Sequence, residues 1–190
     1  MDGRRLQPLR KMGRLTHRTT PGFTYFVSTK TWDNHAVFQV PEAAEIVVWC
    51  LAHYRDAGAY LLHEFVVMPD HLHVLLTPTK DVTLEKAVQL IKGRSSHDIR
   101  VRRGGHTPVW QVGFHEESVR DAKDFAQKSE YIWMNPVRAR LVDKPKDWPY
   151  GSIAGNFKLD PMPERLKDLA SGAEAPQTRA AYVGAKAPTP

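Results

Sequence analysis

Three short stretches of the chain carry the apolar patterns of β-strands: one alternates apolar and polar residues, and two are nearly continuous apolar runs. The alternating stretch is 23–31 and the two runs are 59–68 and 71–78, all rich in β-branched and aromatic or aliphatic residues. Pro69 and Asp70 separate the last two stretches and predict a turn. We therefore expect a hairpin, whose second strand is central and buried.

Three longer segments instead carry apolar residues at helical spacing. The segment 41–58 begins with a proline and ends with a glycine, which are common helix boundaries. Thr83 is placed to cap a second helix over 84–103. A third helix is expected over 121–138, and Pro136 should kink or end its last turn.

The order of these elements predicts the fold class. With a further extended piece at 108–119, the chain runs strand, helix, strand, strand, helix, strand, helix. That order favours an α+β ferredoxin-like sandwich, in which one antiparallel sheet has helices packed on one face. We expect a basic flexible arm at 1–20, one folded domain at 21–152 and a poorly ordered tail at 153–190.

The composition excludes several classes of protein. No apolar run reaches the roughly 18–20 residues that cross a bilayer, and residues 1–14 lack the apolar centre of a signal peptide. Cys50 is the single cysteine, which excludes an intramolecular disulfide framework and a cysteine-rich zinc site. We expect Cys50 to be a small buried apolar residue, and the protein to be cytoplasmic.

Positive charge is concentrated in two places. The formal net charge is +6; residues 1–20 hold six basic side chains against one acidic, and residues 85–103 hold six against two. Clustered positive charge suits a polyphosphate partner, because each neutralised phosphate releases condensed counterions. The alternative is a solvated tail and a solvated helix face.

His71 and His73 are separated by one residue in a predicted strand. Because strand side chains alternate between faces, both imidazoles should project from the same side. Two neutral imidazoles side by side form half of a divalent metal site, and the alternative is a pair that only packs or hydrogen-bonds. On a buried strand each ring needs a polar partner or costs roughly 1–3 kcal/mol, and a bound cation is one such partner.

Tyr131 and Asn135 are spaced i, i+4 on the last predicted helix and so share one face. A tyrosine hydroxyl can act as a nucleophile towards phosphorus. The carbonyl oxygen of an asparagine is a suitable ligand for a hard cation. The alternative is that Tyr131 only packs, half-buried, and that Asn135 only prepares the helix break at Pro136.

Several segments together resemble a known family of DNA-cutting enzymes. VVMPDHLHVLLTP at 66–78 resembles the HUH box of single-tyrosine transposases, and YIWMNPVRARLV at 131–142 resembles their tyrosine helix. Their subgroup, the REP-associated tyrosine transposases of the IS200-like family, is further resembled by residues 91–100, 110–125 and 147–152. The resemblance runs from about Thr20 to Ser152, with two departures: the family often has histidine at Trp133 and commonly serine at Gly151.

The resemblance implies a fold and an activity. Family members have the HUH endonuclease fold and cut single-stranded DNA with a divalent metal. Carried over, His71, His73 and Asn135 would bind Mg²⁺ or Mn²⁺. Tyr131 would attack the scissile phosphate and keep the 5′ end as a phosphotyrosine. The chain would then be a metal-dependent single-stranded DNA endonuclease and strand transferase acting on hairpin-forming repeats, with a monomer favoured over a homodimer.

The basic clusters and the resemblance together predict the residues that contact DNA: Arg10, Lys11, Arg14, Arg18, Lys92, Gly93, Arg94, Arg100 and Arg138. For the helix members, the alternative is a solvated face with a glycine defect. Trp110 and Phe114 would either stack on unpaired bases or pack in the core. Glu64 would be either a general base or a structural carboxylate.

Two other functions stay open. One is a host-adopted, sequence-specific DNA-binding protein that binds such repeats without transposition; in either case we expect the DNA-bound protein to be nucleoid-associated. The other is a ferredoxin-like RNA binder with structural histidines, which predicts exposed aromatic residues on two central strands. The predicted strands are aliphatic instead.

Overall fold

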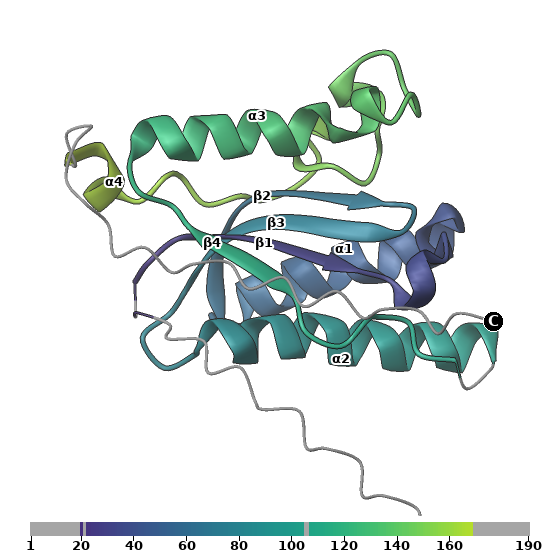
Figure 1. Cartoon of the computed structure of the whole chain (residues 1–190). Helices are drawn as coiled ribbons and strands as arrows, with labels where there is room; N and C mark the ends of the chain where they lie inside the picture. The colour runs from purple at the N-terminus through teal and green to yellow at the C-terminus, as the bar shows by residue number, and fades with distance from the viewer. Residues whose placement is uncertain (1–19, 21, 105–106, 169–190) are drawn as a thin grey trace, which may run out of the picture.

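A four-stranded antiparallel sheet forms the centre of the computed structural model, which describes residue 20, residues 22–104 and residues 107–168 (Figure 1). The strands lie in the order β2-β3-β1-β4. They are β1 (Tyr25–Lys30), β2 (Tyr60–Met68), β3 (His71–Pro78) and β4 (His115–Ser118). The three predicted strands and their hairpin are confirmed, and β3 is central as expected.

Helices cover both faces of the sheet, which corrects the predicted packing on one face. The helices α1 (Pro41–Asp56) and α2 (Leu84–Arg103) lie on one face, and α3 (Ala122–Arg138) lies on the other (Figure 1). The reason is that the strands bury apolar side chains on both sides. Val74 belongs to the core beneath α1 and α2, whereas Leu75 packs in a second core with Ile132 of α3. The α+β class and the antiparallel sheet are confirmed.

Local sequence signals set the helix boundaries. Pro41 is the first residue of α1, where its missing N–H has no intrahelical partner to lose. The Thr83 side chain accepts a hydrogen bond from a backbone N–H in the first turn of α2, and Asp121 does the same for α3. Pro136 lies in the last turn of α3, which ends at Arg138.

The chain after Ser152 is ordered further than predicted. The Asp160 carboxylate accepts hydrogen bonds from the Arg55 guanidinium at 2.8 Å and from the Leu62 backbone N–H at 2.9 Å. Leu166, in the short helix α4 (Glu164–Asp168), is fully buried. The prediction of a poorly ordered tail at 153–190 is therefore wrong up to residue 168. Residues 169–190 and the predicted arm, apart from residue 20, lie outside the described residues.

The core beneath α1 and α2 holds the single cysteine. Cys50 is fully buried, and burial raises the pKa of its thiol to about 12. The prediction of a small buried apolar residue is confirmed. Within the described ranges, no helix is long and apolar enough to cross a membrane.

Candidate active site

Two histidines of β3 lie side by side on the face of the sheet that α3 covers. His71 and His73 flank Leu72, which points to the opposite face and joins the core beneath α1 and α2. The two ring centroids are 4.7 Å apart. The prediction that both imidazoles project from the same side is confirmed.

His71 is oriented by the residue before it. Its Nδ1 lies 2.6 Å from a carboxylate oxygen of Asp70. Because a carboxylate only accepts hydrogen bonds, Nδ1 carries the proton in the neutral ring and Nε2 keeps its lone pair. A histidine held in this way by a carboxylate is prepared to bind a metal through the other nitrogen.

His73 is buried, and one of its ring nitrogens has no partner. Only 6% of the residue is exposed, and its ring stacks on Phe26 with centroids 5.3 Å apart. Burial, together with the neighbouring His71, lowers the pKa of His73 to about 3, so the ring is neutral at pH 7. Its Nδ1 is buried without a hydrogen-bond partner, which costs free energy unless a ligand satisfies it.

Tyr131 of α3 lies against this histidine pair. Its ring centroid is 5.3 Å from that of His73 and 5.8 Å from that of Phe26. The residue is 41% exposed, so a substrate can reach it from solvent. The guanidinium carbon of Arg138 lies 5.3 Å from the centre of the tyrosine ring and adds a positive charge beside the phenol.

Contacts on both sides of Tyr131 hold α3 in place. Ile132 is fully buried in the second core. Lys128 Nζ lies 2.5 Å from a carboxylate oxygen of Glu117 on β4. Because these contacts tie α3 to the sheet within one turn of Tyr131, the position of the phenol is set by packing.

The two histidines offer nitrogen donors of the kind that bind a divalent cation. Asn135 lies one turn after Tyr131 on α3 and is half-buried. Within the described residues, no three His, Cys, Asp or Glu side chains are grouped as a metal site. A cation here would therefore need a ligand of another type, such as the predicted amide oxygen of Asn135. The unpartnered Nδ1 of His73 and the oriented ring of His71 are donors that such a cation would satisfy.

Glu64 is occupied by structural hydrogen bonds. One of its carboxylate oxygens accepts from Trp133 Nε1 at 2.8 Å and from Ser152 Oγ at 2.5 Å. Burial raises the pKa of Glu64, and the two hydrogen bonds oppose that rise. Of the two predicted roles, these contacts favour the structural carboxylate. They also give Trp133, which departs from the family resemblance, a partner of its own on β2.

Lys92 of the basic helix α2 forms hydrogen bonds within the protein. Its Nζ donates to the backbone carbonyls of Gln111 at 2.8 Å and Gly113 at 2.5 Å. Burial lowers the pKa of Lys92 to about 8, despite these two acceptors. Gly93 and Arg100 are exposed, and a Cβ at Gly93 would meet no atom within 4 Å, so packing does not require a glycine there.

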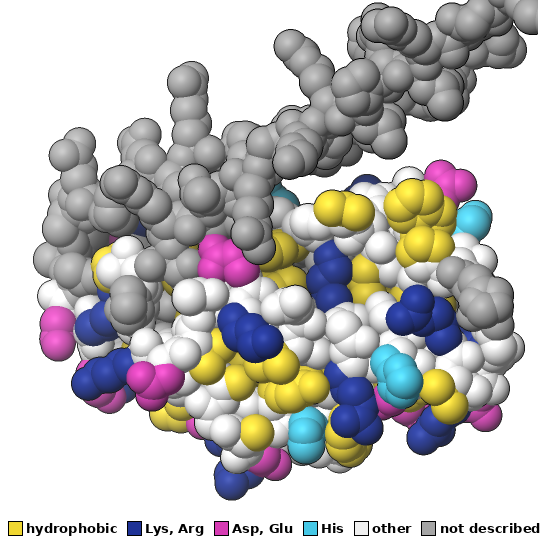
Figure 2. Space-filling model, turned by 90° about the horizontal axis from the view of Figure 1, so that it is seen from below, with side chains coloured by type: hydrophobic (Ala, Val, Ile, Leu, Met, Phe, Trp, Pro, Cys, Tyr) yellow, Lys and Arg dark blue, Asp and Glu magenta, His cyan; other side chains and the backbone are white. Residues whose placement is uncertain are grey.

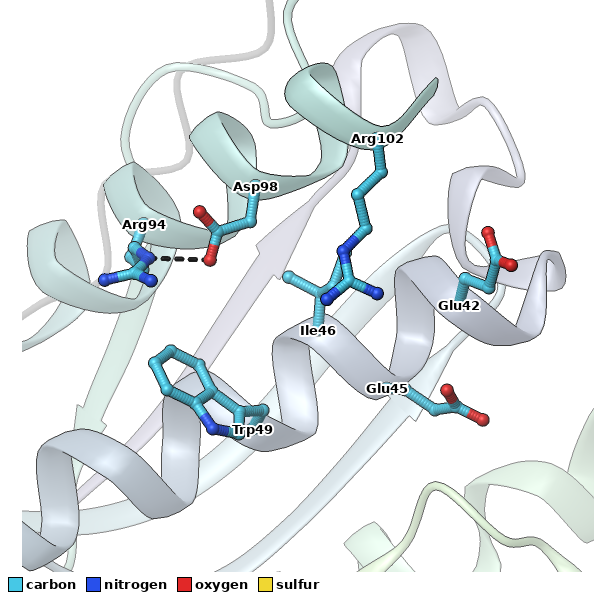
Figure 3. A pocket seen from close by; sticks show the side chains of 7 residues that line it. All are labelled: Glu42, Glu45, Ile46, Trp49, Arg94, Asp98 and Arg102. Atoms are coloured by element: carbon cyan, nitrogen blue, oxygen red, sulfur yellow. Dashed lines mark hydrogen bonds and ion pairs between the residues drawn. The ribbon is translucent and has the colours of Figure 1, made fainter. Parts of the chain in front are cut away.

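Arg94 lines a groove of about 270 Å³ between α1 and α2 (Figure 3). Its Nε donates to the Asp98 carboxylate at 2.6 Å, and its guanidinium carbon lies 4.9 Å from the centre of the Trp49 ring. Glu42 and Glu45 line the same groove. Much of the positive charge of Arg94 is therefore balanced locally.

The other predicted contacts fall in different places. Arg138 lies beside Tyr131, and the arm residues Arg10, Lys11, Arg14 and Arg18 lie outside the described residues. Figure 2 views the molecule from the side of α2 and shows Lys and Arg side chains separated by hydrophobic ones. The predicted DNA contacts remain predictions.

Trp110 and Phe114, for which base stacking and core packing were both open, pack in the core. Trp110 is 5% exposed, and its Nε1 donates to Ser95 Oγ at 3.0 Å. Phe114 is partly buried against the same core. Of the two predicted roles, core packing therefore describes Trp110 and Phe114.

A family model matches more than half of the chain. The model of the family described as "Transposase IS200 like" matches residues 31–135, more than half of the chain. The chain belongs to the IS200-like transposase family. The matched range includes His71, His73, Tyr131 and Asn135, and the predicted family resemblance is confirmed.

Two curated relatives resemble this IS200-like transposase in sequence. A putative REP-associated tyrosine transposase of Haemophilus influenzae is 31% identical over 111 residues, 52% of this chain and 61% of the relative. The REP-associated tyrosine transposase of Escherichia coli is 29% identical over 93 residues, 48% of this chain and 53% of the relative. The matched part therefore spans less than two thirds of either relative.

A solved structure shows the same fold. It is a REP-associated tyrosine transposase bound to a REP hairpin, which superposes on this IS200-like transposase with a TM-score of 0.64 at 20% identity. The superposition covers 86% of this chain and 99% of that one. The α+β architecture of a four-stranded antiparallel sheet with helices is thus that of a tyrosine transposase.

Sequence reasoning missed two residues that shape the site of this IS200-like transposase. Phe26 contacts both His73 and Tyr131, and only the register of β1 against β3 could have shown this. Asp70 was expected to serve the turn. Its position next to His71 was the available signal for its hydrogen bond to the ring.

Proposed function

We propose that this IS200-like transposase is a metal-dependent endonuclease and strand transferase of single-stranded DNA at hairpin-forming repeats. The observation that carries the proposal is the Tyr131 ring lying 5.3 Å from His73, whose buried Nδ1 has no partner. A nucleophile beside a pair of imidazoles suits phosphoryl transfer at a divalent cation. The names of the relatives and the hairpin in the solved structure support the substrate class.

In the proposed reaction the Tyr131 oxygen attacks the phosphorus of the scissile phosphodiester. The bond from Oη to phosphorus forms as the bond from phosphorus to O3′ breaks, so the 5′ side of the cut stays on the tyrosine. The phenolic proton passes to water at this exposed position, and the released O3′ takes up a proton. Attack by the 3′-hydroxyl of another strand reverses these bonds, so rejoining needs no ATP.

His71, His73 and Asn135 are the proposed ligands for Mg²⁺ or Mn²⁺. When bound, the cation would polarise a non-bridging phosphate oxygen and stabilise the charge of the transition state. Two neighbouring side chains orient the proposed histidine ligands. Asp70 fixes the ring of His71, and Phe26 packs against His73. Burial keeps His73 neutral, so its ring has a lone pair to offer.

Arg138 is the proposed phosphate contact nearest the nucleophile. Its guanidinium lies 5.3 Å from the centre of the Tyr131 ring, where the negative charge of an attacked phosphate would gather. The predicted contacts from the arm and from α2 would extend this surface along the DNA backbone. The monomeric state and the cytoplasmic, nucleoid-bound location remain predictions.

A covalent-adduct assay tests the function. The full chain is incubated with a labelled DNA hairpin carrying single-stranded flanks, with Mg²⁺ or Mn²⁺, and adducts are separated under denaturing conditions. We expect an adduct that EDTA and Tyr131→Phe both abolish. Tyr54→Phe, which removes a hydroxyl from α1 on the opposite face, is the matched control and should keep the adduct.

The same assay distinguishes the alternative function. Tight binding of the hairpin without any adduct would support a host-adopted DNA-binding protein instead. Unchanged cutting by Tyr131→Phe would reject the tyrosine as the nucleophile.

A further inference from the structure

The strand register places a lysine directly beside the histidine pair. Lys30, the last residue of β1, is the cross-strand partner of His71. The backbone N–H of Thr31 donates to the carbonyl oxygen of Asp70 at 2.8 Å, so these two residues form a hydrogen-bonded pair. Along an antiparallel pair of strands, hydrogen-bonded and non-hydrogen-bonded residue pairs alternate. The next pair, Lys30 and His71, is therefore non-hydrogen-bonded, and in such pairs the side chains lie closer together.

Lys30 also lies on the same face of the sheet as Tyr131. Residues directly opposite each other share a face, and His71 is on the face that α3 covers. Phe26 precedes Lys30 by four residues on the same strand and therefore shares that face too, and its ring contacts Tyr131. Lys30 is exposed, so its ammonium can reach a ligand bound over the histidines.

Among the described residues, no acidic side chain forms an ion pair with Lys30. The ion pairs found in this part of the chain involve other cations. An exposed ammonium beside a candidate divalent metal site favours an anion bound between the two positive charges.

We propose that Lys30 binds the scissile phosphate, with its ammonium against a non-bridging oxygen while Tyr131 attacks. The inference rests on the proposed function and adds a phosphate-binding residue to the same site. Lys30 lies one residue before the range matched by the family model and outside both basic clusters. Its position follows only from the pairing of β1 with β3.

The test asks whether Lys30 and one particular phosphate interact. The cleavage position is first mapped with the wild-type adduct. Hairpin DNA is then made with either the normal phosphate or an uncharged methylphosphonate at that position, and affinities are measured by fluorescence anisotropy in the Tyr131→Phe background, which leaves the DNA uncut. The variants are Lys30→Met, Lys30→Arg and Lys86→Met, the last removing an exposed charge from α2 on the opposite face.

With Lys30 present, the methylphosphonate should weaken binding about tenfold. In Lys30→Met the methylphosphonate should no longer weaken binding, whereas in Lys30→Arg and Lys86→Met it should weaken binding as in the wild type. Lys30→Met should also reduce the slope of log affinity against log salt by about 0.7–1. An equal methylphosphonate effect with Lys30 and with Lys30→Met would overturn the proposal.

A second readout excludes a purely structural role. The affinity for Mn²⁺ without DNA, followed by electron paramagnetic resonance, should be unchanged or higher in Lys30→Met. A loss of Mn²⁺ binding would overturn the proposal, because Lys30 would then be supporting the cation ligands. If the wild type forms no adduct, the proposed function fails, but a methylphosphonate scan along the flank still tests Lys30. A methylphosphonate effect that depends on Lys30 at one position of the flank supports the inference. A scan in which no position shows such an effect overturns it.

Discussion

Replacing Glu64 distinguishes a structural carboxylate from a general base. Glu64→Ala removes the acceptor of two hydrogen bonds, from Trp133 Nε1 at 2.8 Å and from Ser152 Oγ at 2.5 Å. These bonds join β2 to α3 and to the short 3₁₀ helix Ser152–Ala154. Their loss should therefore loosen the helix that carries Tyr131.

The expected cost follows from the two donors left behind. A buried donor without an acceptor costs about 1–3 kcal/mol. Glu64 is half-buried, so water replaces part of each bond, and we expect Glu64→Ala to lower the free energy of unfolding by about 2–4 kcal/mol. Glu64→Gln keeps an acceptor oxygen and nearly the same volume, so we expect a change of about 1 kcal/mol or less.

Ionisation of Glu64 makes the stability of the protein fall as pH rises. Burial raises the pKa of Glu64 above its ordinary value of 4.5, so the folded protein holds this proton more tightly than the unfolded chain. This contribution to stability is complete below the ordinary pKa and is lost as pH rises through the raised value. Glu64→Gln cannot ionise, so its stability relative to the wild type should increase as pH rises above the ordinary pKa of 4.5 and through the raised value.

Urea denaturation and the rate of adduct formation measure the two effects separately. We expect Glu64→Gln to form the adduct within about threefold of the wild-type rate, since loss of a general base costs about 10²–10⁴-fold. The double variant Trp133→Phe/Glu64→Ala should lose less free energy of unfolding than the two single variants together. The hydrogen bond between Trp133 and Glu64 is lost only once in the double variant. A Glu64→Gln protein that is fully stable but makes no adduct would refute the structural role.

Three further predictions concern the site and the basic helix. His73→Leu removes a buried unpartnered nitrogen, so it should raise the free energy of unfolding of the metal-free protein by up to about 1 kcal/mol, as measured by urea denaturation in EDTA. The same change should abolish the adduct in the adduct assay. Asp70→Asn should weaken Mn²⁺ binding by about 10–100-fold in titrations, with DNA binding in EDTA unchanged. Because burial lowers the pKa of Lys92 from 10.5 to about 8, wild-type stability should rise relative to Lys92→Met across that range, and a constant difference would contradict this.

Local periodicity was enough to predict the parts of the site that lie within one element. Alternation along a strand put His71 and His73 on one side, and helical spacing put Tyr131 and Asn135 one turn apart. Neither conclusion needs knowledge of any other element. The same is true of the cap residue Thr83, whose side chain accepts a hydrogen bond inside its own helix start.

Pairing between distant elements could not be predicted in the same way. The strands are apolar on both faces, so the pattern did not show that α3 takes the face opposite α1 and α2. Lys30 and Phe26 come near the histidines only through the register of β1 with β3. Glu64 was equally compatible with two roles until Trp133 and Ser152, 69 and 88 residues away in sequence, contacted it.

The central claim is that Tyr131 becomes covalently bonded to DNA. Trypsin should release this residue in the peptide 129–138, SEYIWMNPVR, in which Tyr131 is the only tyrosine. After nuclease trimming of the adduct formed with Mn²⁺, mass spectrometry should find a nucleotide phosphate on that tyrosine, and none when EDTA is present. A nucleotide on any other peptide, or cut DNA without a modified peptide, would contradict the account.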